Sequence, residues 1–186
     1  RLAYGGAQEY YDVTPDLCTL GKIIAGGYPL AMIAGKKEIL GHFDAQNSQG
    51  SNYLPQIGTL NGNPIASVAG LKTLEILQRP GSYEHIFKVG NILIDSLNNL
   101  FEQSNIPVQI VGEPPVFDIF FTSKEVKDYR SSQDANKDLL MRFNKLLLQK
   151  NIFRGDTKFY PSLAHTDEDI QKTVEAFTFA IENLRG

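Results

Sequence analysis

The residue best suited to chemistry is Lys22, which stands in a largely apolar run, PDLCTLGKIIAGGYP, with glycines on both sides. An ammonium group among apolar side chains is poorly solvated, so its neutral amine form is favoured relative to a surface lysine. A neutral amine is a nucleophile, and its commonest task is a Schiff base with a carbonyl compound or an aldehyde cofactor. The same run also fits a lysine at the end of a short strand that reaches into solvent, so the local pattern leaves both interpretations open.

A second candidate is the turn at residues 58–64, GTLNGNP, which contains Thr59 and leads into a helix. Asn63 is a good N-cap and Pro64 a good first helical residue. Free backbone N–H groups, a hydroxyl and a helix N-terminus together suit a phosphate, although a capped loop without a ligand explains the segment equally well. Thr59 follows Lys22 by 37 residues. An activated lysine and a phosphate-binding turn are what an aldehyde cofactor with a phosphate, such as pyridoxal 5′-phosphate, requires.

The remaining chemical candidates are weaker. The three histidines have no partners at metal-ligand spacing, and helix capping explains the acids that follow His165, so we expect no metal site. Cys18 fits a small buried hydrophobe better than a nucleophile. Asp118 lies between phenylalanines, where we expect a hydrogen-bonded structural role.

Helical and strand-like patterns alternate along the chain and predict an α/β or α+β fold. Residues 30–34, LAMIA, form an apolar run typical of a buried strand in a parallel sheet. The polar stretch at 42–57 reads as a long loop. Further strands are expected at 108–111 and 116–122, and helices after Asn63 and around residues 86–101, 139–147 and 170–184. The last of these shows apolar residues at spacings of 4, 3, 4 and 3, and a close relative of a capping box precedes it at 166–169.

Glycine usage divides the chain. Eleven of the sixteen glycines lie in residues 1–70 and five in the remaining 116. The first part is typical of turns and short strands, and the second of amphipathic helices alternating with strands. We therefore expect two domains, residues 1–80 and residues 81–186.

The composition excludes several function classes. With 186 residues, 42% hydrophobic and 21% charged, the chain is typical of a globular protein. A net charge of −3 offers no basic face for a nucleic acid, and no apolar run approaches the roughly 20 residues of a membrane span. The single cysteine excludes an intrachain disulfide and favours a reducing, cytoplasmic location. Because the chain opens on Arg1 without an initiator methionine, we expect a fragment of a longer protein.

Three segments carry a family resemblance: PDLCTLGKIIAGGYP, GTLNGNP and the later SLAHTDEDI. In this order they resemble the C-terminal portion of class-III pyridoxal-phosphate-dependent aminotransferases, and the resemblance covers essentially the whole chain. Within that family the chain is most similar to the glutamate-1-semialdehyde 2,1-aminomutases.

The resemblance implies roles for particular residues. Lys22 matches the lysine that binds the cofactor covalently and then shuttles a proton. Thr59, in a turn with Gly58, matches the threonine that binds the cofactor phosphate, typically from the neighbouring subunit of a homodimer. The implied fold is fold type I: residues 1–80 would be the C-terminal part of the large cofactor domain and residues 81–186 the small α+β C-terminal domain. The implied reaction is an internal amino shift that yields 5-aminolevulinate, with an intermolecular transamination as the alternative.

The chain also departs from the family pattern. The aspartate that pairs with the pyridine nitrogen, the glycine-rich phosphate turn and the aromatic residue that stacks on the ring would all lie upstream of Arg1. Without the carboxylate the ring is a weak electron sink. We therefore expect this chain alone to be inactive, and a non-catalytic fragment is the competing hypothesis. Tyr28 and residues 30–35 also differ from the usual mutase pattern, which leaves the substrate open.

Overall fold

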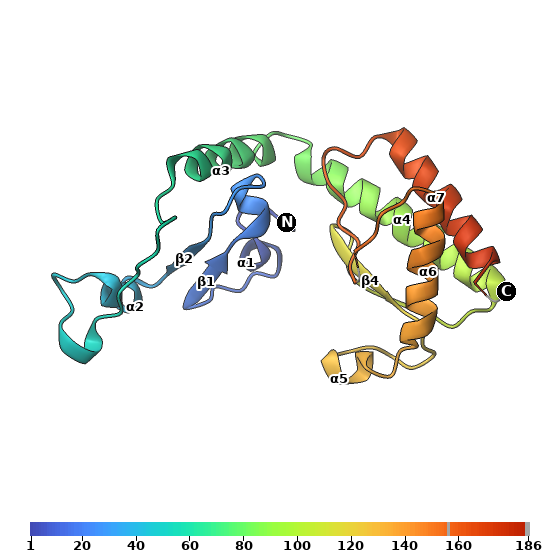
Figure 1. Ribbon diagram of the computed structural model, residues 1–186, viewed down its shortest axis with the longest axis horizontal. Coiled ribbons are helices and arrows are strands. Elements are labelled where there is room, and N and C mark those ends of the chain that lie inside the picture. Colours follow the sequence, from blue (N-terminus) through green and yellow to red (C-terminus); the bar gives the residue numbers. More distant parts are fainter. Residues whose placement is uncertain (156, 185–186) are drawn as a thin grey trace. The chain divides into compact units, whose positions relative to one another are not determined.

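The computed structural model describes residues 1–155 and 157–184, in which two pairs of strands are interspersed among helices (Figure 1). The chain divides into two compact units, Arg1–Ser82 and Tyr83–Gly186. The predicted mixture of helices and strands is confirmed. None of the described helices combines the length and the apolar character that crossing a membrane requires.

The first unit is built from short elements and one long helix. In chain order these are α1 (Ala7–Tyr10), β1 (Leu17–Leu20), the 3₁₀ helix η1 (Lys22–Ala25), β2 (Met32–Gly35), α2 (Lys37–Leu40), the 3₁₀ helices η2 (Gly41–Phe43) and η3 (Gly50–Asn52), and α3 (Pro64–Leu77). β1 and β2 pair antiparallel, with Cys18 opposite Ala34 and Leu20 opposite Met32.

Strand β2 corrects the prediction for residues 30–34. It is antiparallel to β1, because the chain folds back between the two strands, and all four of its residues are exposed. An apolar run predicts burial only where a layer covers it, and within the described residues no further strand pairs with β2 and none of its residues is buried.

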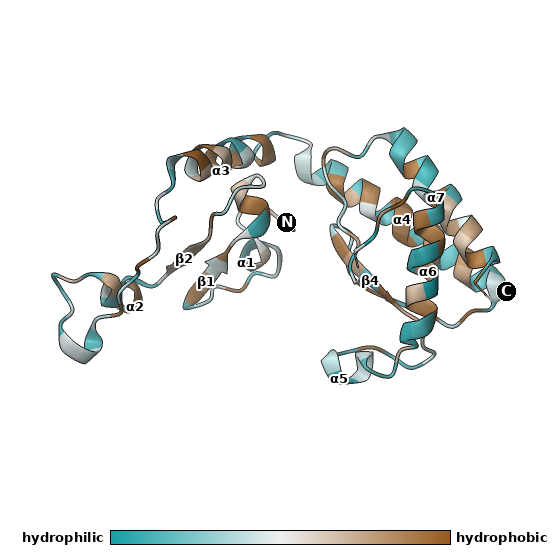
Figure 2. Cartoon of the chain, viewed as in Figure 1, coloured by the Kyte–Doolittle hydropathy of each residue, from teal (hydrophilic) through white to brown (hydrophobic). Residues whose placement is uncertain are grey.

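Helix α3 begins where its capping residues predict. The side-chain Oδ1 of Asn63 accepts the backbone N–H of Ala66 at 3.1 Å, and Pro64 is the first helical residue. Its buried face consists of small residues, Ala66 and Gly70. Three large apolar residues of the helix, Ile65, Val68 and Leu71, are exposed, and Figure 2 shows hydrophobic residues along α3. Their exposed fractions are 63% for Ile65, 66% for Val68 and 63% for Leu71.

The second unit contains a hairpin and three long helices. Its elements are α4 (Ser82–Ser104), β3 (Gln109–Glu113), β4 (Val116–Phe120), α5 (Tyr129–Ser132), α6 (Lys137–Gln149) and α7 (Asp167–Glu182). β3 and β4 pair antiparallel, with Glu113 opposite Val116, so the turn between them is only Pro114-Pro115. β3 extends further toward the turn than predicted, because Gly112 and Glu113 belong to it.

Phenylalanine rings fill the core of this unit. The ring of Phe143 on α6 lies 6.0 Å from that of Phe101, 5.9 Å from that of Phe121 and 6.3 Å from that of Phe177, centroid to centroid. Phe121 follows β4, and the face predicted for this strand is buried, including Ile119. Apolar periodicity therefore places these elements around one core.

Asp118 has the structural role that its phenylalanine neighbours predict. Its Oδ1 lies 2.5 Å from a guanidinium nitrogen of Arg154 and accepts the backbone N–H of Ile119 at 2.8 Å. The Arg154 side chain is 2% exposed, donates to Asn144 at 2.9 Å and lies 4.5 Å above the ring of Phe159. The ion pair joins β4 to the segment after α6.

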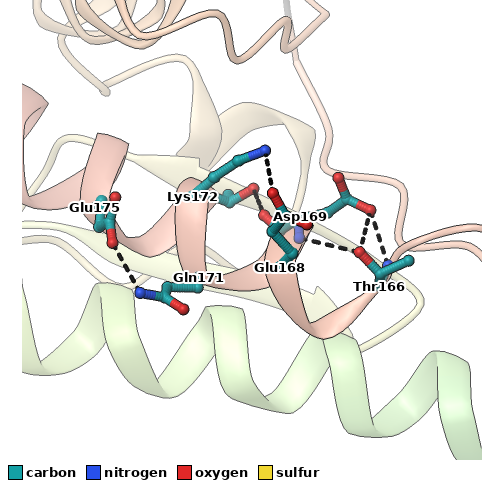
Figure 3. A network of polar contacts seen from close by, with 7 residues as sticks. Thr166, Glu168, Asp169, Gln171, Lys172 and Glu175 are labelled. Atoms are coloured by element: carbon teal, nitrogen blue, oxygen red, sulfur yellow. Dashed lines mark hydrogen bonds and ion pairs between the residues drawn. The ribbon is translucent and has the colours of Figure 1, made fainter.

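Helix α7 opens with a capping box, as predicted (Figure 3). The backbone N–H of Asp169 donates to the hydroxyl of Thr166, and the backbone N–H of Thr166 donates to the carboxylate of Asp169 at 2.9 Å. The backbone N–H of Thr166, and then its hydroxyl, hold the pKa of Asp169 below its ordinary value. Helix capping therefore explains why an acidic residue stands at position 169.

Candidate active site

Lys22 is the first residue of η1, and only Gly21 separates it from the end of β1. It is exposed, so the desolvation predicted from its apolar neighbours is wrong for the described chain: those neighbours do not enclose the amine. Its backbone is unusual, with φ at 55°. The other described non-glycine residues with positive φ are Asp12, Asn105 and Asn151, whose short polar side chains tolerate this region.

A lysine has no such local hydrogen-bonding advantage, and a left-handed backbone at a non-glycine residue costs on the order of 1–3 kcal/mol. Such a conformation persists where the surrounding structure determines it, and it is found disproportionately at functional sites. The backbone of Lys22 is therefore the first geometric indication that this position is special.

Close packing of η1 against α3 fixes the segment after Lys22. A Cβ added at Gly26 would lie 2.6 Å from the hydroxyl of Thr73 and 3.1 Å from the carbonyl oxygen of Ala69. A Cβ at Gly70 would lie 3.0 Å from the carbonyl oxygen of Ile24. Gly26 itself has φ at 57°. Gly26 and Gly70 therefore let η1 and the middle of α3 approach backbone to backbone, which gives Gly26 a packing role.

The turn before α3 presents unpaired donors. The backbone N–H of Asn61 donates to Gly58 O at 3.0 Å, and that of Asn63 donates to Leu60 O at 3.1 Å. Within the described chain, the backbone N–H groups of Gly58, Thr59 and Leu60 and the Thr59 hydroxyl have no hydrogen-bond partner. Three adjacent N–H groups, a hydroxyl and the N-terminus of a 14-residue helix are an arrangement that can bind an anion.

The side chain of Asn61 folds back over this turn. A Cβ at Gly58 would meet its Oδ1 at 2.8 Å, and its Nδ2 lies 3.5 Å from the carbonyl oxygen of Gln56. Glycine at position 58 thus leaves room for a neighbouring side chain.

The two predicted segments border one hollow of about 780 Å³. It is lined by Thr19 and Leu20 of β1, residues 29–33, Phe43, Gln56 and residues 60–62. Lys22, Gly58 and Thr59 themselves do not line this hollow. Thr19 and Leu20, shortly before Lys22, and Leu60, directly after Thr59, do line it. The structure therefore brings the two segments to one place, but not the three predicted side chains themselves.

Sequence reasoning missed the lining residues Met32 and Phe43. Met32 belongs to the run predicted as a buried strand, and Phe43 belongs to the loop at 42–57. An apolar residue at the start of a long polar loop is a signal that could have indicated Phe43. Within residues 1–155 and 157–184, no group of three His, Cys, Asp or Glu side chains is placed to hold a metal ion.

A family model and several solved structures both relate the chain to aminotransferases. The profile of the Aminotransferase class-III family matches residues 4–181. An ω-transaminase from Sphaerobacter thermophilus is 29% identical, with a TM-score of 0.89, and the match covers 100% of this chain and 42% of that one. A β-phenylalanine aminotransferase from Variovorax paradoxus is 25% identical, with a TM-score of 0.81 over 95% of this chain and 40% of that one.

A transaminase with PLP bound shares the fold at 22% identity, with a TM-score of 0.85 over 98% of this chain and 42% of that one. The chain thus spans about two fifths of the length of these transaminases.

Proposed function

The chain belongs to the class-III aminotransferase family, and we propose that it contributes to the transfer of an amino group with pyridoxal 5′-phosphate as cofactor. The observation that carries this proposal is the geometry of the first unit. A lysine with a left-handed backbone and a donor-rich turn at a helix N-terminus belong to segments that border the same hollow.

The residues present fit the phosphate of this cofactor. We assign phosphate binding to the backbone N–H groups of Gly58 and Thr59 and to the Thr59 hydroxyl, which have no partner within the described chain. Hydrogen bonds to a charged group are about twice as strong as neutral ones, and the positive end of α3 adds to them. Lys22 would then hold the other end of the cofactor through its Nζ.

When bound, the cofactor supplies an aldehyde that accepts the amino group and a ring that withdraws electrons from the adjacent carbon. The part assigned to Lys22 Nζ is to hold the cofactor and to move a proton at the substrate carbon. Lys22 is exposed and its segment borders the hollow, and this proposal gives its amine access to a molecule bound there.

Residues 1–80 are proposed to form the C-terminal part of a large cofactor domain and residues 81–186 a small C-terminal domain of fold type I. The coverage of about two fifths supports a longer parent protein. The family resemblance assigns the carboxylate that faces the ring nitrogen to the part of such a parent upstream of Arg1. We therefore propose that the longer protein catalyses the reaction and that this chain alone turns over little or no substrate.

The family resemblance adds a homodimer to the proposal, in which the Thr59 turn would bind the phosphate of a cofactor held by the partner subunit, as an alternative to the arrangement within one chain described above. The apolar side of α3 supports it, since Ile65, Val68 and Leu71 are each more than 60% exposed. Burying such residues against a second copy would stabilise the assembly. Val68→Lys should lower the association constant in sedimentation experiments, whereas Lys72→Ala, on the same helix, should not.

Two reactions fit this site. An internal amino shift on glutamate 1-semialdehyde agrees with the motif resemblance, and an intermolecular transamination agrees with the ω-transaminase and the β-phenylalanine aminotransferase among the similar structures. Activity assays of the longer protein would distinguish the two reactions. Production of 5-aminolevulinate from the semialdehyde alone would support the first, and a requirement for a separate keto acid would support the second.

The test of the proposed function is cofactor affinity. Pyridoxal 5′-phosphate is titrated into the chain, its Thr59→Val variant and a control variant, Thr14→Val, which alters an exposed threonine away from the turn. Loss of a hydrogen bond to a charged group, about 1.5–3 kcal/mol, should weaken binding roughly tenfold or more for Thr59→Val. Equal affinities in all three proteins would contradict the assignment.

A further inference from the structure

The turn before α3 contains the one Asn-Gly pair of the sequence, Asn61-Gly62. Asparagine followed by glycine can modify itself. The backbone nitrogen of the glycine attacks the side-chain carbonyl carbon of the asparagine, and the missing Cβ leaves that attack unhindered. A bond forms between this nitrogen and Cγ, and the bond from Cγ to the side-chain nitrogen breaks. The nitrogen leaves as ammonia, taking up the proton that the attacking backbone nitrogen loses.

The product is a five-membered succinimide ring. Water then opens the ring at either of its two carbonyl groups, giving aspartate or isoaspartate. One water is consumed and one ammonia released overall, with no oxidant or reductant. The reaction therefore needs only solvent and a backbone that does not hold the two groups apart.

The fold leaves both reacting groups accessible. Asn61 and Gly62 are exposed, and Gly62 has φ at 68°. A Cβ built at Gly62 would meet nothing within 4 Å. Across residues 1–155 and 157–184, the backbone N–H of Gly62 donates to no acceptor. The Asn61 carboxamide is held by one 3.5 Å contact with Gln56 O, at the weak end of hydrogen bonding.

Asn63, two residues later, provides an internal comparison. Its Oδ1 is engaged by the backbone N–H of Ala66 at 3.1 Å. It is followed by Pro64, whose ring nitrogen carries no hydrogen and cannot complete the same reaction. The two asparagines of this turn thus differ in two ways. Asn61 is followed by a residue with a backbone N–H and has a weakly held side chain, whereas Asn63 is followed by proline and has a hydrogen-bonded side chain.

We propose that Asn61 is a site of spontaneous deamidation in the folded protein, and that the modification lowers the affinity of this turn for phosphate. The second part rests on the proposed function. Asn61 Oδ1 lies where it would touch a side chain at position 58, so the new carboxylate lies beside Gly58, whose N–H is one of the proposed phosphate donors. Isoaspartate, in addition, lengthens the backbone between the turn and α3.

The first experiment measures the modification without any cofactor. The full chain is incubated at mildly alkaline pH beside a synthetic peptide of residues 56–66, and the asparagines are followed by peptide mapping with isoaspartate detection. Asn61 should convert at a rate comparable to that of the peptide, while Asn63 stays intact. Asn61→Gln should remove the signal, and Gly62→Ala should slow it. An Asn61 that persists in the folded chain while the peptide converts would overturn the proposal.

The second experiment tests the consequence. Pyridoxal 5′-phosphate and inorganic phosphate are titrated into Asn61→Asp and Asn61→Ser. A like charge near the phosphate should weaken binding about tenfold or more in the aspartate variant relative to the serine variant. Equal binding in the two variants would overturn the consequence. If Asn61 converts but unmodified chain binds neither anion, the proposed function fails and the modification stands.

Discussion

The two units are held together in different ways. Among described residues of the first unit, the buried apolar residues are Ala25 and Ala66. The second unit instead encloses a core of phenylalanine, leucine and isoleucine side chains contributed by β4, α4, α6 and α7. All three residues predicted to contact the cofactor, Lys22, Gly58 and Thr59, lie in the unit with the smaller core.

The difference shows how a site can be positioned without a large core. Glycines let η1 meet α3 backbone to backbone, and hydrogen-bonded turns shape the segment before α3. In the second unit, by contrast, side-chain packing determines the arrangement. Substitutions should therefore act through backbone contacts in one unit and through lost volume or lost ion pairing in the other.

The largest expected effect comes from emptying the core of the second unit. Phe143→Ala removes a ring that contacts three others, and it should lower the free energy of unfolding by about 3–5 kcal/mol. Hydrogen exchange of α6 and α7 peptides in a urea series measures this unit separately. Phe153→Ala, which changes a side chain that is 86% exposed, is the control and should change little. Equal loss in the two variants would show that the rings do not form a cooperative core.

A comparable effect should follow from breaking the buried ion pair. Asp118→Ala leaves the 2% exposed Arg154 side chain without its carboxylate, and such losses cost about 3–5 kcal/mol. Asp134→Ala breaks the exposed pair with Lys124 and should cost less than about 1 kcal/mol. Hydrogen exchange of the second unit in a urea series should show a larger loss of unfolding free energy for Asp118→Ala than for Asp134→Ala. A small loss for Asp118→Ala would place the ion pair outside the cooperative core.

A smaller effect is expected in the first unit. Gly26→Ala combines a positive φ with a collision against Thr73, so it should lower local stability by about 1–3 kcal/mol. Gly27→Ala also has a positive φ but meets no atom within 4 Å. Protection of α3 amides should fall further in the first variant than in the second. The same loss in both would mean that backbone strain, rather than contact with α3, dominates.

The smallest effect is the pH dependence of the α7 cap. Because hydrogen bonds from Thr166 lower the pKa of Asp169 in the folded state, its stabilisation is complete above the ordinary value of 3.8. It is lost as the pH falls through the lowered pKa of the folded state. Amide protection at the start of α7 should decline over this range, and Asp169→Asn should remove that decline. Asp167→Asn, in the same turn, should preserve it, and a decline unchanged in Asp169→Asn would contradict the assignment.

Local patterns predicted most helices and their ends, because capping and apolar periodicity act within a few residues. The predicted helix start at Asn63 and Pro64 and the predicted capping at Thr166–Asp169 are confirmed. The exposure of Lys22 and of β2 could not be predicted, because burial depends on which distant segments cover a run. Neither could the left-handed backbone of Lys22, since periodicity carries no information about φ at a single residue.

The most direct test of the account is where pyridoxal 5′-phosphate becomes attached to this chain. The cofactor is added, the protein is reduced with borohydride, and the modified lysine is located by peptide mass spectrometry in the chain, in Lys22→Ala and in Lys37→Ala, an exposed lysine of the same unit. The account predicts attachment at Lys22 that is lost in Lys22→Ala and preserved in Lys37→Ala. Attachment spread over surface lysines, or none, would contradict it.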